Sequence, residues 1–206
     1  MDAADWDTRY AASDLVWGAP PNRYVVEYAA ALALPADRPG RALDLACGEG
    51  RNALWLATRG WEVTGSDYSG VALAKAAEVA ARSPRAVVSR LAWRQADAAT
   101  DELGGPYDLV LHVYLHLPPT QRRAVLTAVC AALAPGGTLI LAAHDSTNLT
   151  DGTGGPQDPA LLFTPDDVVA ELAWDMTVLV AEQPRREVEG ALRQAIDCVV
   201  VARRAS

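Results

Sequence analysis

A glycine loop that follows a short apolar run is the part of this 206-residue chain best suited to chemistry. The run ends at Asp44, Gly48 and Gly50 follow, and a helical pattern begins directly afterwards. A second apolar run over 61–65 leads to Asp67, 17 residues after Gly50. Strand, glycine turn, helix, strand and acid in this order are typical of a nucleotide-binding βαβ unit. Because Gly48-x-Gly50-x-x-Ala53 also fits the dinucleotide fingerprint, the spacing alone leaves the nucleotide open.

Three acidic residues help to choose between nucleotides. Asp44, Asp67 and Asp97 each follow a run predicted to be a strand. Since the carboxyl ends of parallel strands meet at one edge of a sheet, these carboxylates should gather around the ligand. They would repel a pyrophosphate and attract a cationic amine or sulfonium. The pattern favours a positively charged nucleoside without phosphates, although Asp67 could serve only as a helix cap and the glycines only as a tight turn.

Histidine and tyrosine side chains near the ends of two further strands are the candidates for catalysis. His112 and Tyr114 end the fourth predicted strand, and His144 ends the fifth, where a reacting group would lie. Asp145 follows directly and is a candidate for holding the substrate. Each histidine could act as a general base, since its ordinary pKa lies near neutrality. The alternative is that a histidine on a buried strand is a core residue.

The elements that must position these residues follow an alternating pattern. Apolar runs predict strands over 42–46, 61–65, 91–95, 107–113 and 138–143, with helices over 22–34, 49–58, 69–82, from Pro118-Pro119 and from Thr164. Longer strands over 174–182 and 191–203 form an expected antiparallel hairpin. The sequence therefore predicts an α/β protein, with helices on both faces of a mostly parallel sheet.

Two segments are expected to cover the site within one domain spanning 1–206. Residues 1–35 form an expected N-terminal cap, in which Tyr10 and Trp17 shield the ligand; Trp17 could instead only pack the first helix. The segment 144–163 is polar and glycine-rich, and loops of that length are often active-site lids.

Composition excludes several classes of protein. A net charge of −8 and a pI near 4.8 disfavour nucleic acid as a partner. The three cysteines lack metal-ligand spacing, which favours a reducing compartment and argues against a structural zinc site. The first residues contain no signal peptide, and no apolar run is long enough for a bilayer. We therefore expect a cytoplasmic protein, a monomer or a homodimer, that acts on a small molecule without nucleic acid, membrane or metal.

Motifs in a fixed order identify the chain as similar to class I S-adenosylmethionine-dependent methyltransferases. The likeness rests on the acid and glycine loop, 44–50, the acid Asp67, the pair Asp97-Ala98, the strand motif 107–110, and the turn 133–137. The resemblance implies the three-layer Rossmann-like fold of that family, with a seven-stranded sheet and a C-terminal antiparallel hairpin. Within the family, the run 47–52 resembles the small tellurite- and thiopurine-type enzymes.

The resemblance also assigns residues to the expected cofactor, S-adenosylmethionine. It places the ribose hydroxyls at Asp67, and the remaining contacts at Asp44, Ala46, Cys47, Gly48, Gly50, Arg51, Asn52, Tyr68, Asp97, Ala98, His112, Tyr10 and Trp17. The tellurite-type likeness further suggests that Arg186 and Arg193 of the hairpin face the substrate. The acceptor atom, whether S, N, O or a metalloid, stays open.

Two alternatives to an S-adenosylmethionine-dependent methyltransferase remain. A nicotinamide-dependent oxidoreductase would need a catalytic pair such as Tyr-x-x-x-Lys. The only lysine of the chain, Lys75, lies on the helix predicted over 69–82, which is not where such a pair would lie. A cofactor-binding regulator without catalysis is the other alternative.

Overall fold

The computed structural model describes residues 3–16, 18 and 20–206, so Trp17 lies outside the described residues. The strands are β1 (Arg41–Leu45), β2 (Glu62–Asp67), β3 (Leu91–Gln95), β4 (Tyr107–Val113), β5 (Leu133–His144), β6 (Met176–Glu182), β7 (Arg185–Arg186) and β8 (Ala195–Arg204). The helices are α1 (Ala3–Ala11), α2 (Arg23–Ala29), α3 (Arg51–Thr58), α4 (Gly70–Ala80), α5 (Arg85–Val88), α6 (Pro119–Ala132), α7 (Asn148–Asp151) and α8 (Pro165–Glu171), with a 3₁₀ turn, η1, over Pro159–Leu161.

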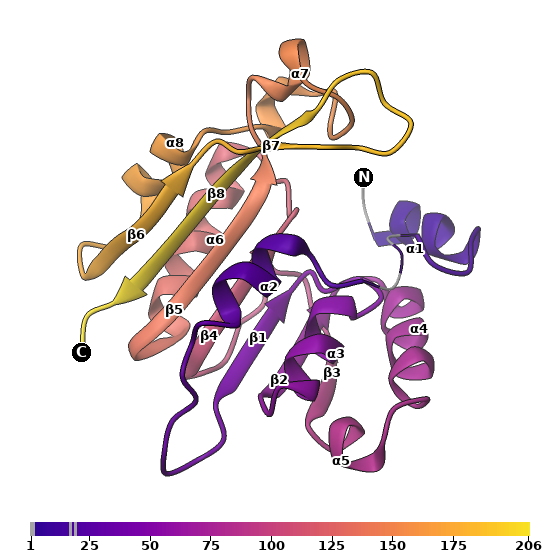
Figure 1. Ribbon diagram of the computed structural model, residues 1–206, viewed down its shortest axis with the longest axis vertical. Helices are drawn as coiled ribbons and strands as arrows, with labels where there is room; N and C mark the ends of the chain where they lie inside the picture. The colour runs from indigo at the N-terminus through magenta and orange to yellow at the C-terminus, as the bar shows by residue number, and fades with distance from the viewer. Residues whose placement is uncertain (1–2, 17, 19) are drawn as a thin grey trace.

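One mixed sheet carries the strands in the order β3-β2-β1-β4-β5-β8-β6 (Figure 1). Strands β3, β2, β1, β4 and β5 pair in parallel, whereas β8 is antiparallel to β5 and β6. The short strand β7 pairs with the beginning of β8. The predicted mostly parallel sheet with antiparallel C-terminal strands is confirmed. The carboxyl ends of β1, β2, β3, β4 and β5 and the start of β8 therefore share one edge, called here the strand-end edge.

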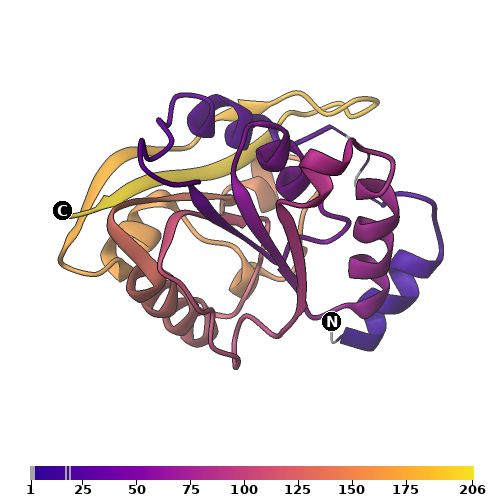
Figure 2. The ribbon, with the colours of Figure 1, turned by 90° about the horizontal axis from the view of Figure 1, so that it is seen from below.

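Two helical layers cover the sheet (Figure 2). Helices α2 and α3 bury Val25, Ala53 and Leu56 against one face. On the other face, α6 and α8 bury Leu126, Val168 and their neighbours. Burying apolar side chains on both faces explains why β4 and β5 are almost continuously apolar.

Polar caps fix where several helices begin, as the sequence predicts. Ser69 Oγ accepts a hydrogen bond from the backbone N–H of Ala72 at 3.1 Å and caps α4. Thr164 and Asp167 exchange hydrogen bonds in a capping box at the start of α8. These caps anchor the two helices on opposite faces of the sheet.

Several expected boundaries are wrong. The helix expected over 22–34 ends at Ala29, and Leu34 instead packs against the backbone of Gly40 and Gly60. Strand β5 begins at Leu133 rather than at 138, because the turn residues 134–137 form an irregularity within its pairing with β4. The strand expected over 191–203 begins at Ala195. The segment 144–163 is not a plain loop, because it contains α7 and η1.

None of the helices that the structure describes is both long and apolar enough to cross a membrane.

Candidate active site

The backbone turns sharply where β1 and β4 reach the strand-end edge. Ala46 and Tyr114 have φ values of 54° and 56°, in the left-handed region that residues other than glycine rarely adopt. Gly48 and Gly50 of the glycine loop have φ values of 54° and 76°. Gly50 also has no room for a side chain, since a Cβ atom there would lie 2.5 Å from Trp93 Cη2. These conformations direct the loop backbone across the ends of β1 and β2.

Asp67 braces the glycine loop from the end of β2. Its Oδ2 accepts a hydrogen bond from the backbone N–H of Gly48 at 2.8 Å, and its Oδ1 accepts one from Ser69 at 2.9 Å. Burial raises the pKa of this carboxyl group, while the two backbone donors oppose the rise. Cys47 is buried within the loop, and its N–H donates to Ser66 O.

Asp44 lies beneath the first turn of α3. Its Oδ2 accepts a hydrogen bond from the N–H of Ala53 at 3.0 Å, and the residue is 1% exposed. Burial raises the pKa of Asp44 to about 7, against the influence of Arg51. The Oδ1 of Asn52 accepts a hydrogen bond from the N–H of Asn22 at 2.8 Å. One oxygen of Asp44 is therefore directed at the first turn of α3, and the predicted contact of Asp44 with the ligand stays a prediction.

Helix α1 lies beside the N-terminal end of α4, near the glycine loop (Figure 1). Asp7 Oδ1 accepts hydrogen bonds from Ser69 Oγ at 2.5 Å and from the N–H of Val71 at 3.3 Å. In return, Lys75 Nζ donates to the carbonyl oxygens of Tyr10 and Ser13 at the end of α1. Tyr10 is buried at this junction.

The end of β3 presents the third predicted acid. Asp97 is half-buried, and its Oδ1 accepts a hydrogen bond from the N–H of Ala99 at 2.9 Å, next to half-buried Ala98. Tyr68, half-buried, follows Asp67 at the end of β2. The structure thus brings the predicted cofactor residues of three strands to one edge of the sheet.

A second group, called here the Asp197 cluster, consists of Asp197, Tyr24, Tyr114 and Arg186. The fully buried carboxylate of Asp197 in β8 accepts hydrogen bonds from Tyr24 Oη at 2.9 Å, Tyr114 Oη at 3.1 Å and Arg186 Nε at 2.8 Å. Burial is the largest cause that raises the pKa of both tyrosines, and Asp197 adds to it. Both phenols therefore stay protonated at neutral pH.

Two imidazoles stack beside this cluster. The ring centroid of His144 lies 4.9 Å from that of Tyr114 and 5.3 Å from that of His116. The backbone N–H of His144 donates to His116 Nε2 at 3.1 Å, and His144 Nδ1 lies 3.4 Å from the same atom. Burial lowers the pKa of both rings, that of His116 to about 3, so both are neutral at pH 7.

His112 lies near the end of β4, opposite Leu45, with its side chain buried in the core. It is 0% exposed and shares a face of β4 with Val110, which packs on the α6 side. Neither ring nitrogen has a hydrogen-bond partner among the described residues, and burial lowers the pKa to about 4. Side chains alternate between the two faces of a strand, so the sequence could have predicted that His112 shares the face of Val110.

Asp145 and Arg193 hold the segment 144–163 in place. The Oδ1 of buried Asp145 accepts hydrogen bonds from the N–H of Thr147 at 2.8 Å and from Gln183 Nε2 at 2.7 Å. Arg193 Nη1 donates to Thr150 O at 2.6 Å. These contacts are internal to the fold, and the roles of both residues in holding the substrate stay predictions.

The sequence did not predict that three further residues lie close to Tyr114 and His144, namely Asp197, Tyr24 and His116. They come from β8, α2 and the turn after β4, and no sequence spacing joins them. Only the sheet order, which sets β8 beside β5, brings them to Tyr114 and His144.

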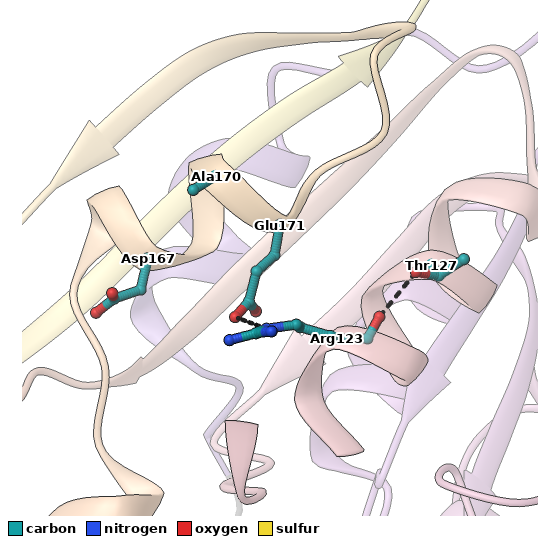
Figure 3. A pocket seen from close by; sticks show the side chains of 5 residues that line it. All are labelled: Arg123, Thr127, Asp167, Ala170 and Glu171. Carbon is teal, nitrogen blue, oxygen red and sulfur yellow. Dashed lines mark hydrogen bonds and ion pairs between the residues drawn. The ribbon is translucent and has the colours of Figure 1, made fainter. Parts of the chain in front are cut away.

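A surface hollow between α6 and α8 lies apart from these residues (Figure 3). Its lining includes Arg123 and Glu171, joined by an ion pair of 3.1 Å, and none of the predicted site residues. In the described part of the chain, no three histidine, cysteine or acidic side chains are grouped to hold a metal ion.

The central region of the chain is similar in sequence to known proteins. Residues 42–137 match the family described as a methyltransferase domain. Thiocyanate methyltransferase 1 of Brassica oleracea is 31% identical over 147 residues, 70% of this chain and 62% of that protein. Trans-aconitate 2-methyltransferase of Streptomyces avermitilis is 42% identical over 110 residues, 52% of this chain and 39% of that protein. The chain therefore spans less than two thirds of the length of these relatives.

Solved structures share the fold. The N-methyltransferase NodS from Bradyrhizobium japonicum, in complex with S-adenosylhomocysteine, has a TM-score of 0.73 at 17% identity, over 100% of both chains. TehB from Haemophilus influenzae has a TM-score of 0.69 at 20% identity, over 87% of this chain and 61% of that chain.

The strand order and the glycine loop at the strand-end edge define a Rossmann-like methyltransferase fold. The matching family makes this more specific: residues 42–137 match a methyltransferase domain, which supports the predicted class I S-adenosylmethionine-dependent methyltransferase. Neither the matching family nor the relatives support the alternative of a nicotinamide oxidoreductase.

Proposed function

We propose that the protein transfers a methyl group from S-adenosylmethionine to a small-molecule acceptor. The observation that carries the proposal is the pair of buried carboxylates, Asp44 and Asp67, on either side of the glycine loop. Burial is the largest cause that raises the pKa of both carboxyl groups, and the charge of Asp67 adds to the rise at Asp44 as that of Asp7 does at Asp67. A cationic ligand relieves this repulsion, whereas a pyrophosphate would increase it.

The residues at the strand-end edge fit the parts of that cofactor. The loop residues Ala46, Cys47, Gly48, Gly50, Arg51 and Asn52, above Asp44, would hold the methionine end. Asp67 would accept hydrogen bonds from the ribose hydroxyls, and Tyr68, Asp97 and Ala98 would surround the adenine. Tyr10 in α1 would cover the cofactor, as would Trp17. His112, near the end of β4, stays a predicted contact of the cofactor, and its side chain is fully buried.

Tyr114 would lie between the bound cofactor and the acceptor. It follows the end of β4, next to β1 and its glycine loop, and its hydroxyl joins the Asp197 cluster next to His144. The cofactor would supply an activated methyl group, so the chain's residues mainly align the acceptor and exclude water. The relatives are named for thiocyanate and trans-aconitate, which supports a small acceptor held near Tyr114.

We further propose that the segment 144–163 covers the acceptor. Gly155, at φ 74°, lies against the ring of His144, since a Cβ atom there would be 2.7 Å from His144 Cγ. Gly155→Ala should therefore displace His144 and lower turnover without changing affinity for S-adenosylhomocysteine. Gly154→Ala is the matched control, because Gly154 has φ 70° and open space around its Cα. Equal losses in the two variants, or a loss of cofactor affinity, would count against a covering role.

Calorimetric titration tests the proposed function. S-adenosylhomocysteine should bind the wild-type protein, and NAD should not. Asp67→Ala should weaken that binding by roughly 10- to 100-fold, since hydrogen bonds to a charged group contribute about 1.5–3 kcal/mol. Asp37→Ala makes the same change at an exposed position and should leave affinity unchanged. Tight NAD binding, or an unaltered affinity in Asp67→Ala, would overturn the assignment.

A further inference from the structure

We infer that His116 and His144 work as a pair in which His116 orients His144 to take the proton of a neutral hydroxyl acceptor, of the phenol type. This inference rests on the proposed function and narrows its acceptor. It makes His144 the catalytic base and His116 a positioning residue.

The hydrogen bonds between the two rings fix their tautomers. His116 Nε2 accepts the backbone N–H of His144 at 3.1 Å, so this nitrogen carries no hydrogen. A neutral His116 must then carry its hydrogen on Nδ1. His144 Nδ1 lies 3.4 Å from the same nitrogen, and because that nitrogen only accepts, His144 Nδ1 can bond to it only by donating. The hydrogen of neutral His144 therefore resides on Nδ1, which leaves Nε2 as a lone-pair acceptor.

The groups packed around His144 keep it neutral before the reaction. Tyr114 of the β4 end and His116 of the following turn face it, and both are uncharged at neutral pH. Arg186 of β7 lowers its pKa and Asp197 of β8 raises it, but these two form an ion pair of 2.8 Å with each other. Since burial is the largest cause and lowers the pKa of His144, the ring is free to accept a proton.

The placement of His144 matches the place of reaction. Tyr114 follows the end of β4, and His144 ends the neighbouring parallel strand β5, so both lie at the strand-end edge that also carries the glycine loop, with their ring centroids 4.9 Å apart. Tyr114, His116 and His144 offer three flat rings, which suit a planar acceptor. No hydrogen bond within the described residues engages His144 Nε2, whereas Asp197 is fully engaged by its cluster.

The proton transfer balances the charge. The hydroxyl oxygen of the acceptor forms a bond to the methyl carbon, and the carbon–sulfur bond breaks with its electron pair left on sulfur. The hydroxyl proton passes to His144 Nε2. The single positive charge thus moves from the sulfonium to the imidazolium of His144, which then releases the proton to water. An acceptor that has no proton to lose, such as thiocyanate, would gain nothing from this base.

Nuclear magnetic resonance tests the pairing without any acceptor, because the chain has only three histidines. Nitrogen-15 spectra of the wild-type protein at pH 7 should show His116 and His144 neutral, each with its hydrogen on Nδ1. A hydrogen on His144 Nε2, or a charged His144, would overturn the inference. His116→Gln places an amide oxygen near the position of Nε2 and should preserve the His144 tautomer, whereas His116→Leu should not.

Kinetics with chosen probes tests the role. A series of simple phenols serves as the protic acceptors, and thiocyanate and iodide as the proton-free ones. His144→Asn should lower kcat for phenols by about 100-fold or more and abolish the acidic limb of the pH profile. Transfer to thiocyanate should fall by a much smaller factor than transfer to phenols, and the affinity for S-adenosylhomocysteine should stay within about two-fold. His116→Leu should lower kcat for phenols and His116→Gln should restore most of it.

Three outcomes would contradict the inference. The first is an equal loss with both kinds of probe, and the second is phenol methylation that is independent of His144. The third is a wild-type protein that methylates thiocyanate or iodide but no phenol. A wild-type protein that fails to bind S-adenosylhomocysteine would instead reject the proposed function itself, so the two failures are distinguishable.

Discussion

Removal of the Asp197 carboxylate should cost more stability than removal of a partly exposed ion-paired acid. Asp197 is fully buried, and Tyr24, Tyr114 and Arg186 all donate to it. Asp197→Ala leaves the guanidinium and two hydroxyl groups without their acceptor. Breaking a buried pair by removing one partner typically costs about 3–5 kcal/mol.

The expected size of the effect can be checked against a matched variant. Asp175 also pairs with an arginine, Arg204, at 3.0 Å, but both side chains are partly exposed. Pairs of that kind contribute about 1 kcal/mol or less, so Asp175→Ala should be mild. For a protein of this size each kcal/mol moves the melting temperature by about 2–4 °C, so Asp197→Ala should lower it by roughly 10 °C.

Urea unfolding followed by tryptophan fluorescence measures both free energies of unfolding. Tyr24→Phe should lose about 1 kcal/mol, because it removes one hydrogen bond and leaves the other two donors in place. If Asp197→Ala costs no more than Asp175→Ala, the three donors do not depend on this carboxylate and the description of the cluster is wrong.

Two further predictions concern His112 and the glycine loop. His112 is neutral in the fold, where its pKa is lowered from 6.5 to about 4. Because the unfolded chain takes up a proton below pH 6.5 and the folded one does not, stability should fall between pH 6.5 and 4 by about 3 kcal/mol from this residue. Urea unfolding at several pH values should show a weaker acid loss in His112→Phe, and an unchanged profile would contradict the cause. Gly50→Ala should cost about 2–4 kcal/mol, since it adds overlap with Trp93 to the strain of φ 76°. Gly190→Ala, at φ 74° in open space, should cost only about 1 kcal/mol, and equal costs would show that the overlap is relieved.

Much of the fold follows from short-range patterns in the sequence. The strands over 91–95 and 107–113 are observed with the predicted bounds, because each apolar run is closed by polar or turn-forming residues. Ser69 and Thr164 start their helices as expected, since capping depends on neighbours within three residues.

The residues around Tyr114 and His144, where we place the acceptor, are brought together by contacts between distant parts of the sequence. No local sequence pattern predicts such contacts. Asp197 meets Tyr24 across 173 positions and Tyr114 across 83. The unpredicted irregularity in β5 has the same origin, because its register depends on pairing with β4. Sequence therefore predicted the conformation around the glycine loop, which lies within one βαβ unit, better than the arrangement around Tyr114 and His144, which the sheet order assembles.

A crystal structure of the protein with S-adenosylhomocysteine bound tests the central claim most directly. We predict the ribose hydroxyls at Asp67, the adenine beside Asp97 and Ala98, and the sulfur directed toward Tyr114 with His144 beyond it. The nucleoside bound elsewhere, or a sulfur facing away from Tyr114, would contradict the proposed methyltransferase site.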